Sequence, residues 1–81
     1  MTIKVNYIQG NRGSVCNNDA YAVVDGTKLL TIIPASTLNS HGLTGDDLKK
    51  AFIQAAEKVA DVPEAKRHAR QEVYARKILG L

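Results

Sequence analysis

The segment from Thr44 to Leu81 has the residue spacing of two amphipathic helices, and this leaves few folds open to the chain. In its first half, apolar residues recur at separations of three and four and form one stripe, made of Leu48, Ala51, Phe52, Ala55 and Val59. The second half is joined to the first at Asp61-Val62-Pro63. Because this connection is short, the two helices are expected to form a hairpin or to cross at a steep angle.

Polar residues mark where the first helix starts. The Thr44 hydroxyl is placed to accept a hydrogen bond from the backbone N–H of Asp47. Asp46 and Asp47 fall in the first turn, where the helix dipole favours negative charge. Ile53 and Ala56 widen the apolar face, so burial on more than one side is expected.

The second helix is bounded by its own signals. Asp61 is predicted to be its N-cap, with Glu64 completing a capping box and Pro63 in the first turn. The helix is expected to run to about Leu79. Gly80 followed by an apolar residue predicts a Schellman ending.

Two different faces are predicted for this second helix. One is an apolar stripe of small residues that would pack closely on the first helix: Val62, Ala65, Ala69 and Val73. Beside it lies a basic ridge with one tyrosine: Lys66, Arg67, Arg70, Tyr74 and Lys77. Such a ridge can contact phosphates or an acidic protein surface, or it can be an ordinary solvated helix face.

The first 33 residues read as a β-meander. Apolar and polar residues alternate over Thr2–Gln9, which is the period of a half-buried strand. Two further strands are predicted at 20–24 and 27–33, joined at Asp25-Gly26 by a type I′ turn in which both residues have positive φ. Pro34 ends the third strand because it has no N–H to donate.

The remaining segments are connections. Gly10–Asp19 is rich in Gly and Asn and is predicted to be a long polar loop. Residues 34–43 form a connector with one helical turn around Ser36–Asn39. The sequence therefore predicts one α+β domain over 1–81: a small antiparallel sheet, in β-β-β-α-α order, with a C-terminal helical hairpin packed on one face.

Composition narrows the class of protein. The chain has no Trp and one Phe, so the core must be mainly aliphatic. A single cysteine excludes an internal disulfide and a cysteine-based zinc cluster. The sequence has neither a signal-peptide pattern nor an apolar run near the roughly 20 residues needed to cross a bilayer. We expect a soluble, cytoplasmic protein that does not bind membranes.

No run of residues specifies a reaction. Gly10-Asn11-Arg12-Gly13 lacks the lysine and hydroxyl residue of a phosphate-binding loop, and no nucleophile elbow or zinc-protease motif occurs. Cys16 and His41 have no motif around them. We therefore expect a non-enzymatic protein with no cofactor and no metal.

The function predicted from the sequence is protein binding. The chain is interpreted as a stand-alone regulator or inhibitor that docks on a larger protein assembly through a helix face, the 10–19 loop or a strand edge. The alternative is a nucleic-acid-binding protein that uses the basic helix. A homodimer through the edge at Thr2–Gln9 stays open. The predicted partner-binding residues are Arg12, Lys66, Arg67, Arg70, Tyr74 and Lys77.

Overall fold

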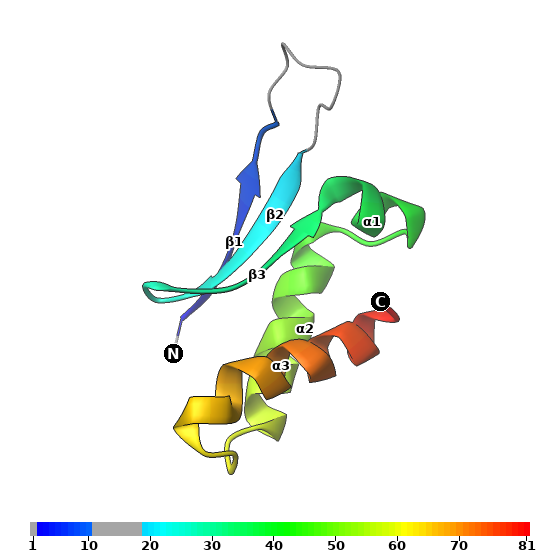
Figure 1. Cartoon of the computed structure of the whole chain (residues 1–81). Coiled ribbons are helices and arrows are strands. Elements are labelled where there is room, and N and C mark those ends of the chain that lie inside the picture. The colour runs from blue at the N-terminus through cyan, green and yellow to red at the C-terminus, as the bar shows by residue number, and fades with distance from the viewer. Residues whose placement is uncertain (1, 11–18) are drawn as a thin grey trace.

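The computed structural model describes residues 2–10 and 19–81. The predictions for Arg12 and Cys16 lie outside these residues. Six elements follow one another along the chain: β1 (Ile3–Ile8), β2 (Ala20–Asp25), β3 (Lys28–Pro34), α1 (Ala35–Ser40), α2 (Gly45–Lys58) and α3 (Glu64–Leu79). The strands lie together and the two long helices lie to one side of them (Figure 1).

The three strands form one antiparallel sheet in the order β1-β2-β3, as the meander predicted. Strand β2 is central, with Val5 opposite Val23 on one side and Thr31 opposite Val23 on the other. The register between β2 and β3 shifts at Val23/Val24, which marks a bulge. Strand β3 ends at Pro34 as expected.

The β2–β3 hairpin is confirmed, but the predicted turn type was wrong. Asp25 stays in the ladder opposite Lys28, so Gly26 and Thr27 form the two-residue loop. Only Gly26 has a positive φ, at 61°, and this sign pattern belongs to a type II′ turn rather than type I′. Asp25 is held as a strand residue because its Oδ1 accepts a hydrogen bond from the Thr2 backbone N–H at 3.1 Å.

The connector contains the predicted helical turn, which is the short helix α1. Leu38 on this helix is buried in the core. The backbone N–H of Leu43 donates to the Leu38 carbonyl at 2.9 Å and turns the chain towards α2. The connector is therefore a packed part of the domain.

Helix α2 starts as predicted. The Thr44 hydroxyl accepts from the Asp47 N–H at 3.3 Å, and the Asp47 carboxylate accepts from the Thr44 N–H at 2.9 Å. These two bonds form a reciprocal capping box. All five residues of the predicted stripe are buried. Ala56 is buried beside them, whereas Ile53 is exposed, so the helix is buried over one broad face only.

The predicted start of the second long helix was wrong. Its N-cap is Pro63 and no side chain caps it, so the capping box of Asp61 and Glu64 does not form. The loop is held in another way, because the Arg67 guanidinium donates to the Val62 carbonyl from Nε at 3.2 Å and from Nη2 at 3.0 Å. An arginine one turn into the helix thus holds the loop through a carbonyl, and no described side chain accepts from the first N–H groups of α3.

The end of α3 matches the prediction. Gly80 has φ 79° in the left-handed region, where glycine carries no Cβ penalty. The Leu81 N–H donates to the Arg76 carbonyl at 2.9 Å, which is the long bond of a Schellman motif. The Leu81 side chain then packs against the core.

The predicted apolar stripe of α3 was also wrong. Ala65, Ala69 and Val73 are exposed, and the buried residues of this helix are Gln71 and Ala75. Ala65 and Ala69 are therefore not buried against α2 as predicted, whereas Ala55 and Ala56 of α2 are buried.

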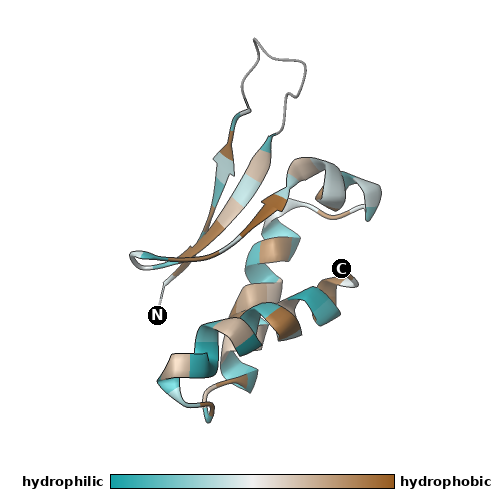
Figure 2. Ribbon diagram, in the orientation of Figure 1, coloured by the Kyte–Doolittle hydropathy of each residue, from teal (hydrophilic) through white to brown (hydrophobic). Residues whose placement is uncertain are grey.

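Side-chain size explains this rotation of α3. The face that turns inward brings Tyr74 and Leu79 against the core, together with Leu81 just beyond the helix. These side chains remove far more apolar area from water than two alanines and one valine would. Most of the α3 ribbon is correspondingly hydrophilic (Figure 2).

One core lies between the sheet and the helices, and it confirms the α+β fold. Helix α2 packs on β1 and β2, and α3 packs on α2 and on β3. Aliphatic side chains dominate around the single phenylalanine, and the buried cluster comprises Ile3, Val23, Ile33, Leu38, Leu48, Ala51, Phe52, Ala55 and Ala75. Within the described part of the chain, no helix has both the length and the apolar character for crossing a membrane.

Candidate partner-binding surfaces

The sheet has an outer face that no described helix covers. Residues directly opposite one another in a sheet share a face. Val23 on β2 and Ile33 on β3 point into the core. Because successive side chains of a strand alternate between the two faces, the neighbours of these residues along each strand point away from the core. The outer face is therefore made of Lys4, Asn6 and Ile8 on β1, Ala20, Ala22 and Val24 on β2, and Leu29, Ile32 and Pro34 on β3.

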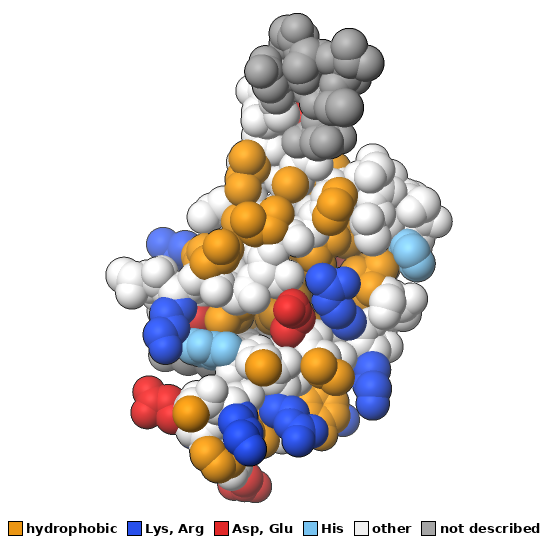
Figure 3. Space-filling model, in the orientation of Figure 1, with side chains coloured by type: hydrophobic (Ala, Val, Ile, Leu, Met, Phe, Trp, Pro, Cys, Tyr) orange, Lys and Arg blue, Asp and Glu red, His pale blue; other side chains and the backbone are white. Residues whose placement is uncertain are grey.

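This outer face is apolar. Leu29 is 57% exposed, Ile32 50% and Ile8 43%, and hydrophobic side chains gather over the strands in the space-filling view (Figure 3). Lys4 is the one charged residue among the nine strand positions of this face. In an antiparallel sheet with one face in water, the side chains on the water face are normally polar, whereas most of those on this face are apolar.

Helix α3 presents a second, basic surface. Lys66, Arg70 and Lys77 are exposed on the side of the helix opposite buried Gln71 and Ala75. None of these three forms an ion pair with another described residue, whereas Arg76 lies 3.8 Å from Glu72 through its Nε, at i, i+4 spacing. Three of the six predicted partner-binding residues therefore share one solvent face.

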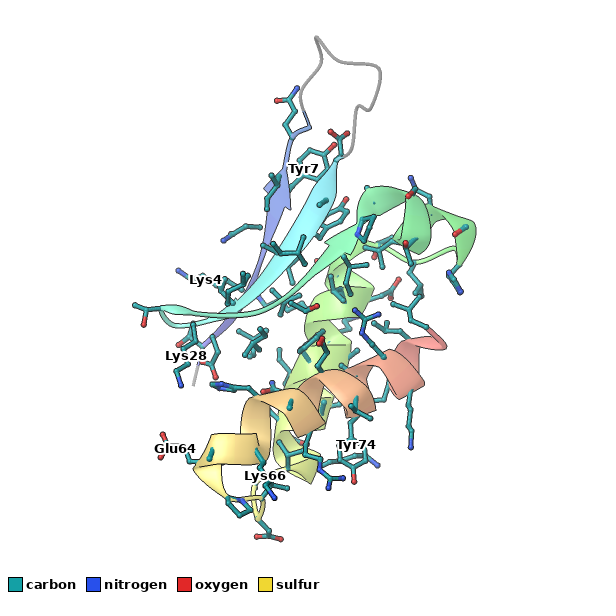
Figure 4. All side chains as sticks on the ribbon, in the orientation of Figure 1. Lys4, Tyr7, Lys28, Glu64, Lys66 and Tyr74 are labelled. Atoms are coloured by element: carbon teal, nitrogen blue, oxygen red, sulfur yellow. The ribbon has the colours of Figure 1, made fainter. Side chains whose placement is uncertain are left out.

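The other two described members of the basic ridge lie closer to the protein. Arg67 is half-buried and its guanidinium is bonded to the Val62 carbonyl. Tyr74 is half-buried and packs against the core. Lys66 and Tyr74 project from the same side of α3, away from the sheet (Figure 4).

A groove of about 500 Å³ lies between β1 and the start of α2. Its walls are the backbone and side chains of β1 on one side and the first turn of α2 on the other, with Lys4, Val5, Asn6, Tyr7, Tyr21, Thr44, Gly45, Asp46 and Lys49 lining it. Gly45 allows the two walls to approach, since a Cβ there would meet the Tyr21 ring at 3.3 Å.

Asp19 joins the two ends of the predicted 10–19 loop. Its Oδ1 accepts a hydrogen bond from the Gly10 N–H at 2.6 Å, and its other carboxylate oxygen accepts from the Tyr7 hydroxyl. Tyr7 also packs edge-to-face on Tyr21, with ring centroids 5.2 Å apart. These contacts fix the positions at which the loop leaves β1 and enters β2.

A smaller hollow of about 210 Å³ lies where α2, α3 and the end of β2 meet. His68 faces Asp25 there at 4.0 Å, so it is a contact between α3 and the sheet. No group of three or more metal-ligating side chains occurs among residues 2–10 and 19–81. His41 is exposed, with its Nδ1 2.9 Å from the Thr37 carbonyl.

The sequence reasoning missed the outer sheet face, although a signal for it was present. The runs at 20–24 and 27–33 are nearly continuous in apolar residues. Continuous runs predict strands buried on both faces, and the two long helices can cover only one. The excess apolar residues of β2 and β3 therefore pointed to a second covering layer.

Comparison with known proteins adds no relative. No protein-family model, curated protein or solved structure matches this chain significantly.

Proposed function

We propose that this protein is a small non-enzymatic binding module that docks on a larger protein through the outer face of its sheet. In the cytoplasm, where its lone cysteine would stay reduced, it would act as a regulator or inhibitor of that partner. The observation that carries the proposal is the exposure of Leu29, Ile32 and Ile8 on one face of the sheet, from both edge strands, which the described elements leave uncovered.

Energetics support a protein partner for this face. Exposed apolar side chains gathered in one patch are typical of interaction sites, and covering a side chain such as Leu or Ile contributes about 1.5–3 kcal/mol. Lys4 is the only charge within the face. The best-fitting partner surface is therefore apolar at its centre, with a carboxylate at the position that meets Lys4.

A pull-down comparing two charged variants tests the proposal. Leu29→Lys/Ile32→Lys places two cations in the outer face without touching the core, so it should fold normally and lose a partner that the unmodified chain retains. Circular dichroism checks the fold, and gel densitometry checks that the retained partner is stoichiometric.

The matched control is Val73→Lys, which adds a cation at an apolar residue of similar exposure, 50%, on the far helix. It should keep the partner. If the outer-face variant keeps the partner, or if the unmodified chain retains none, docking through this face is wrong.

Nucleic-acid binding is the second candidate, and the exposed cations of α3 favour it. Lys66, Arg70 and Lys77 lie on one solvent face, and the chain has a net charge of +3. Each phosphate contact releases counterions, so three contacts give a slope of about −2.7 in log K against log salt on duplex DNA. Glu72 on the same helix opposes such binding.

Fluorescence anisotropy with mixed-sequence DNA and RNA at low salt separates this candidate from protein docking. Lys66→Ala/Arg70→Ala/Lys77→Ala should weaken binding and flatten its salt dependence. The control Lys28→Ala/Lys50→Ala/Lys58→Ala removes the same charge from exposed positions elsewhere. Equal losses in both triple variants would show a general charge effect and no α3 site.

A further inference from the structure

The two edges of the sheet are built differently. Strand β3 is irregular, because the register against β2 shifts at Val23/Val24 and because Pro34 at its end has no N–H. Bulges and prolines are the usual means of preventing an edge from pairing with another strand. Strand β1 is regular against β2 from Ile3 to Ile8 and contains no proline.

The outer edge of β1 carries backbone groups that the sheet does not use. The Gly26 N–H donates to the Thr2 carbonyl at 3.1 Å, which makes Thr2 a bonded partner of β2. Antiparallel ladders alternate, so Lys4 and Asn6 also bond to β2 while Ile3 and Val5 direct their N–H and C=O groups outward. No described strand lies on that side.

We propose that β1 pairs antiparallel with β1 of a second copy of this chain, with the two-fold axis at Val5. This register lets Val5 of each copy exchange two backbone hydrogen bonds. It also sets Ile3 opposite Tyr7 of the second copy and Lys4 opposite its Asn6. The pairing joins the two sheets into one and is independent of the proposed docking on a larger protein.

The side chains of β1 favour the register centred on Val5 over the neighbouring register centred on Lys4. Moving the axis by one residue, to Lys4, sets the two copies of Lys4 directly opposite each other, and opposed like charges destabilise a sheet. The Val5-centred register has no such clash, and it pairs apolar with apolar on the helix side. The groove between β1 and the start of α2 opens beside this edge of the strand.

Sedimentation velocity over a concentration series tests the pairing through Asn6. Asn6 is exposed, so Asn6→Lys should fold normally, yet it sets lysine against Lys4 of the second copy at two places in each dimer. We expect the dimer dissociation constant to rise roughly fivefold or more. The double variant Lys4→Glu/Asn6→Lys restores opposite charges across the axis and should recover the original constant.

The control is Asn39→Lys, which adds the same charge at an exposed position on α1 and should leave the dissociation constant unchanged. A chain that stays monomeric over the whole series overturns the proposal. So does a dimer that Asn6→Lys and Asn39→Lys weaken equally. If Leu29→Lys/Ile32→Lys dissociates the dimer while Asn6→Lys does not, the copies associate through the outer face and the β1 pairing is wrong.

Discussion

Helices α2 and α3 differ little in length, but they contribute to the domain in different ways. Helix α2 starts with a reciprocal capping box and buries five residues along its length, including Phe52. Helix α3 has no side-chain cap, buries only Gln71 and Ala75, and keeps Lys66, Arg70 and Lys77 in solvent. The first helix organises the core, whereas the second covers it and offers a charged surface.

This difference shows which sequence signals determine burial. In α2 the apolar stripe contains Leu48 and Phe52. Burying these two large side chains contributes more free energy than burying any other face of the helix would. In α3 the apolar candidates were alanines and one valine, so the larger residues near the C-terminus fixed the orientation instead. A stripe of small residues predicts the buried face of a helix poorly when larger side chains lie elsewhere on it.

Truncating Phe52 is the strongest way to remove what α2 contributes. Phe52 is fully buried, so Phe52→Ala should cost about 3–5 kcal/mol and leave much of this small domain unfolded. Urea denaturation followed by circular dichroism measures the loss. Val73→Ala on α3 should change stability by less than about 0.5 kcal/mol, and a large loss there would mean that α3 packs through its predicted stripe after all.

Gln71 tests how α3 is attached to α2. Its Nε2 donates to the Phe52 carbonyl at 3.1 Å, and the side chain is buried. Gln71→Ala removes this bond and leaves unfilled volume, so a loss of about 2 kcal/mol is expected in the same denaturation assay. The exposed Gln54→Ala is the matched control and should be nearly neutral. Equal effects at both positions would contradict a role for the buried bond.

The two helix starts give a third test. Thr44→Ala removes the α2 cap and should cost about 1 kcal/mol. Asp61→Ala should stay within about 0.5 kcal/mol, because Asp61 caps nothing in α3. Thermal unfolding of the two variants side by side decides the matter, and similar losses would restore the capping box that the sequence suggested.

The smallest expected effect comes from the Glu72–Arg76 pair on α3. Both side chains are partly exposed, so solvent screens their interaction. Glu72→Gln should cost about 0.3 kcal/mol at low salt and less at high salt. Denaturation at two ionic strengths measures this, and a loss that persists in high salt would point to packing rather than charge.

Much of the fold could be predicted because its signals are local. The alternation in β1, the glycine of the hairpin and the Thr44 cap each act within a few residues, and each element appears where expected. The turn type and the buried face of α3 depend on contacts with distant residues. Asp25 is held by Thr2, and α3 is oriented by the core that it covers.

The candidate surfaces were predictable to different degrees. Charge at helical spacing placed Lys66, Arg70 and Lys77 on one face correctly, because exposure is the default for such residues. The packing of Tyr74 against the core depends on the tertiary structure, whereas the bond from Arg67 to the Val62 carbonyl is a local contact that charge spacing alone does not reveal. The uncovered sheet face required knowing which side the helices take.

The strand order has a consequence for how the chain folds. Each strand pairs with the one next to it in the sequence, and α2 packs with α3 in the same sequential way. Proteins built from contacts between sequence neighbours lose little loop entropy before each contact forms and cross their folding barrier quickly. The contact of α2 with β1 spans a long stretch of chain, so its closure should set the rate at which the domain folds.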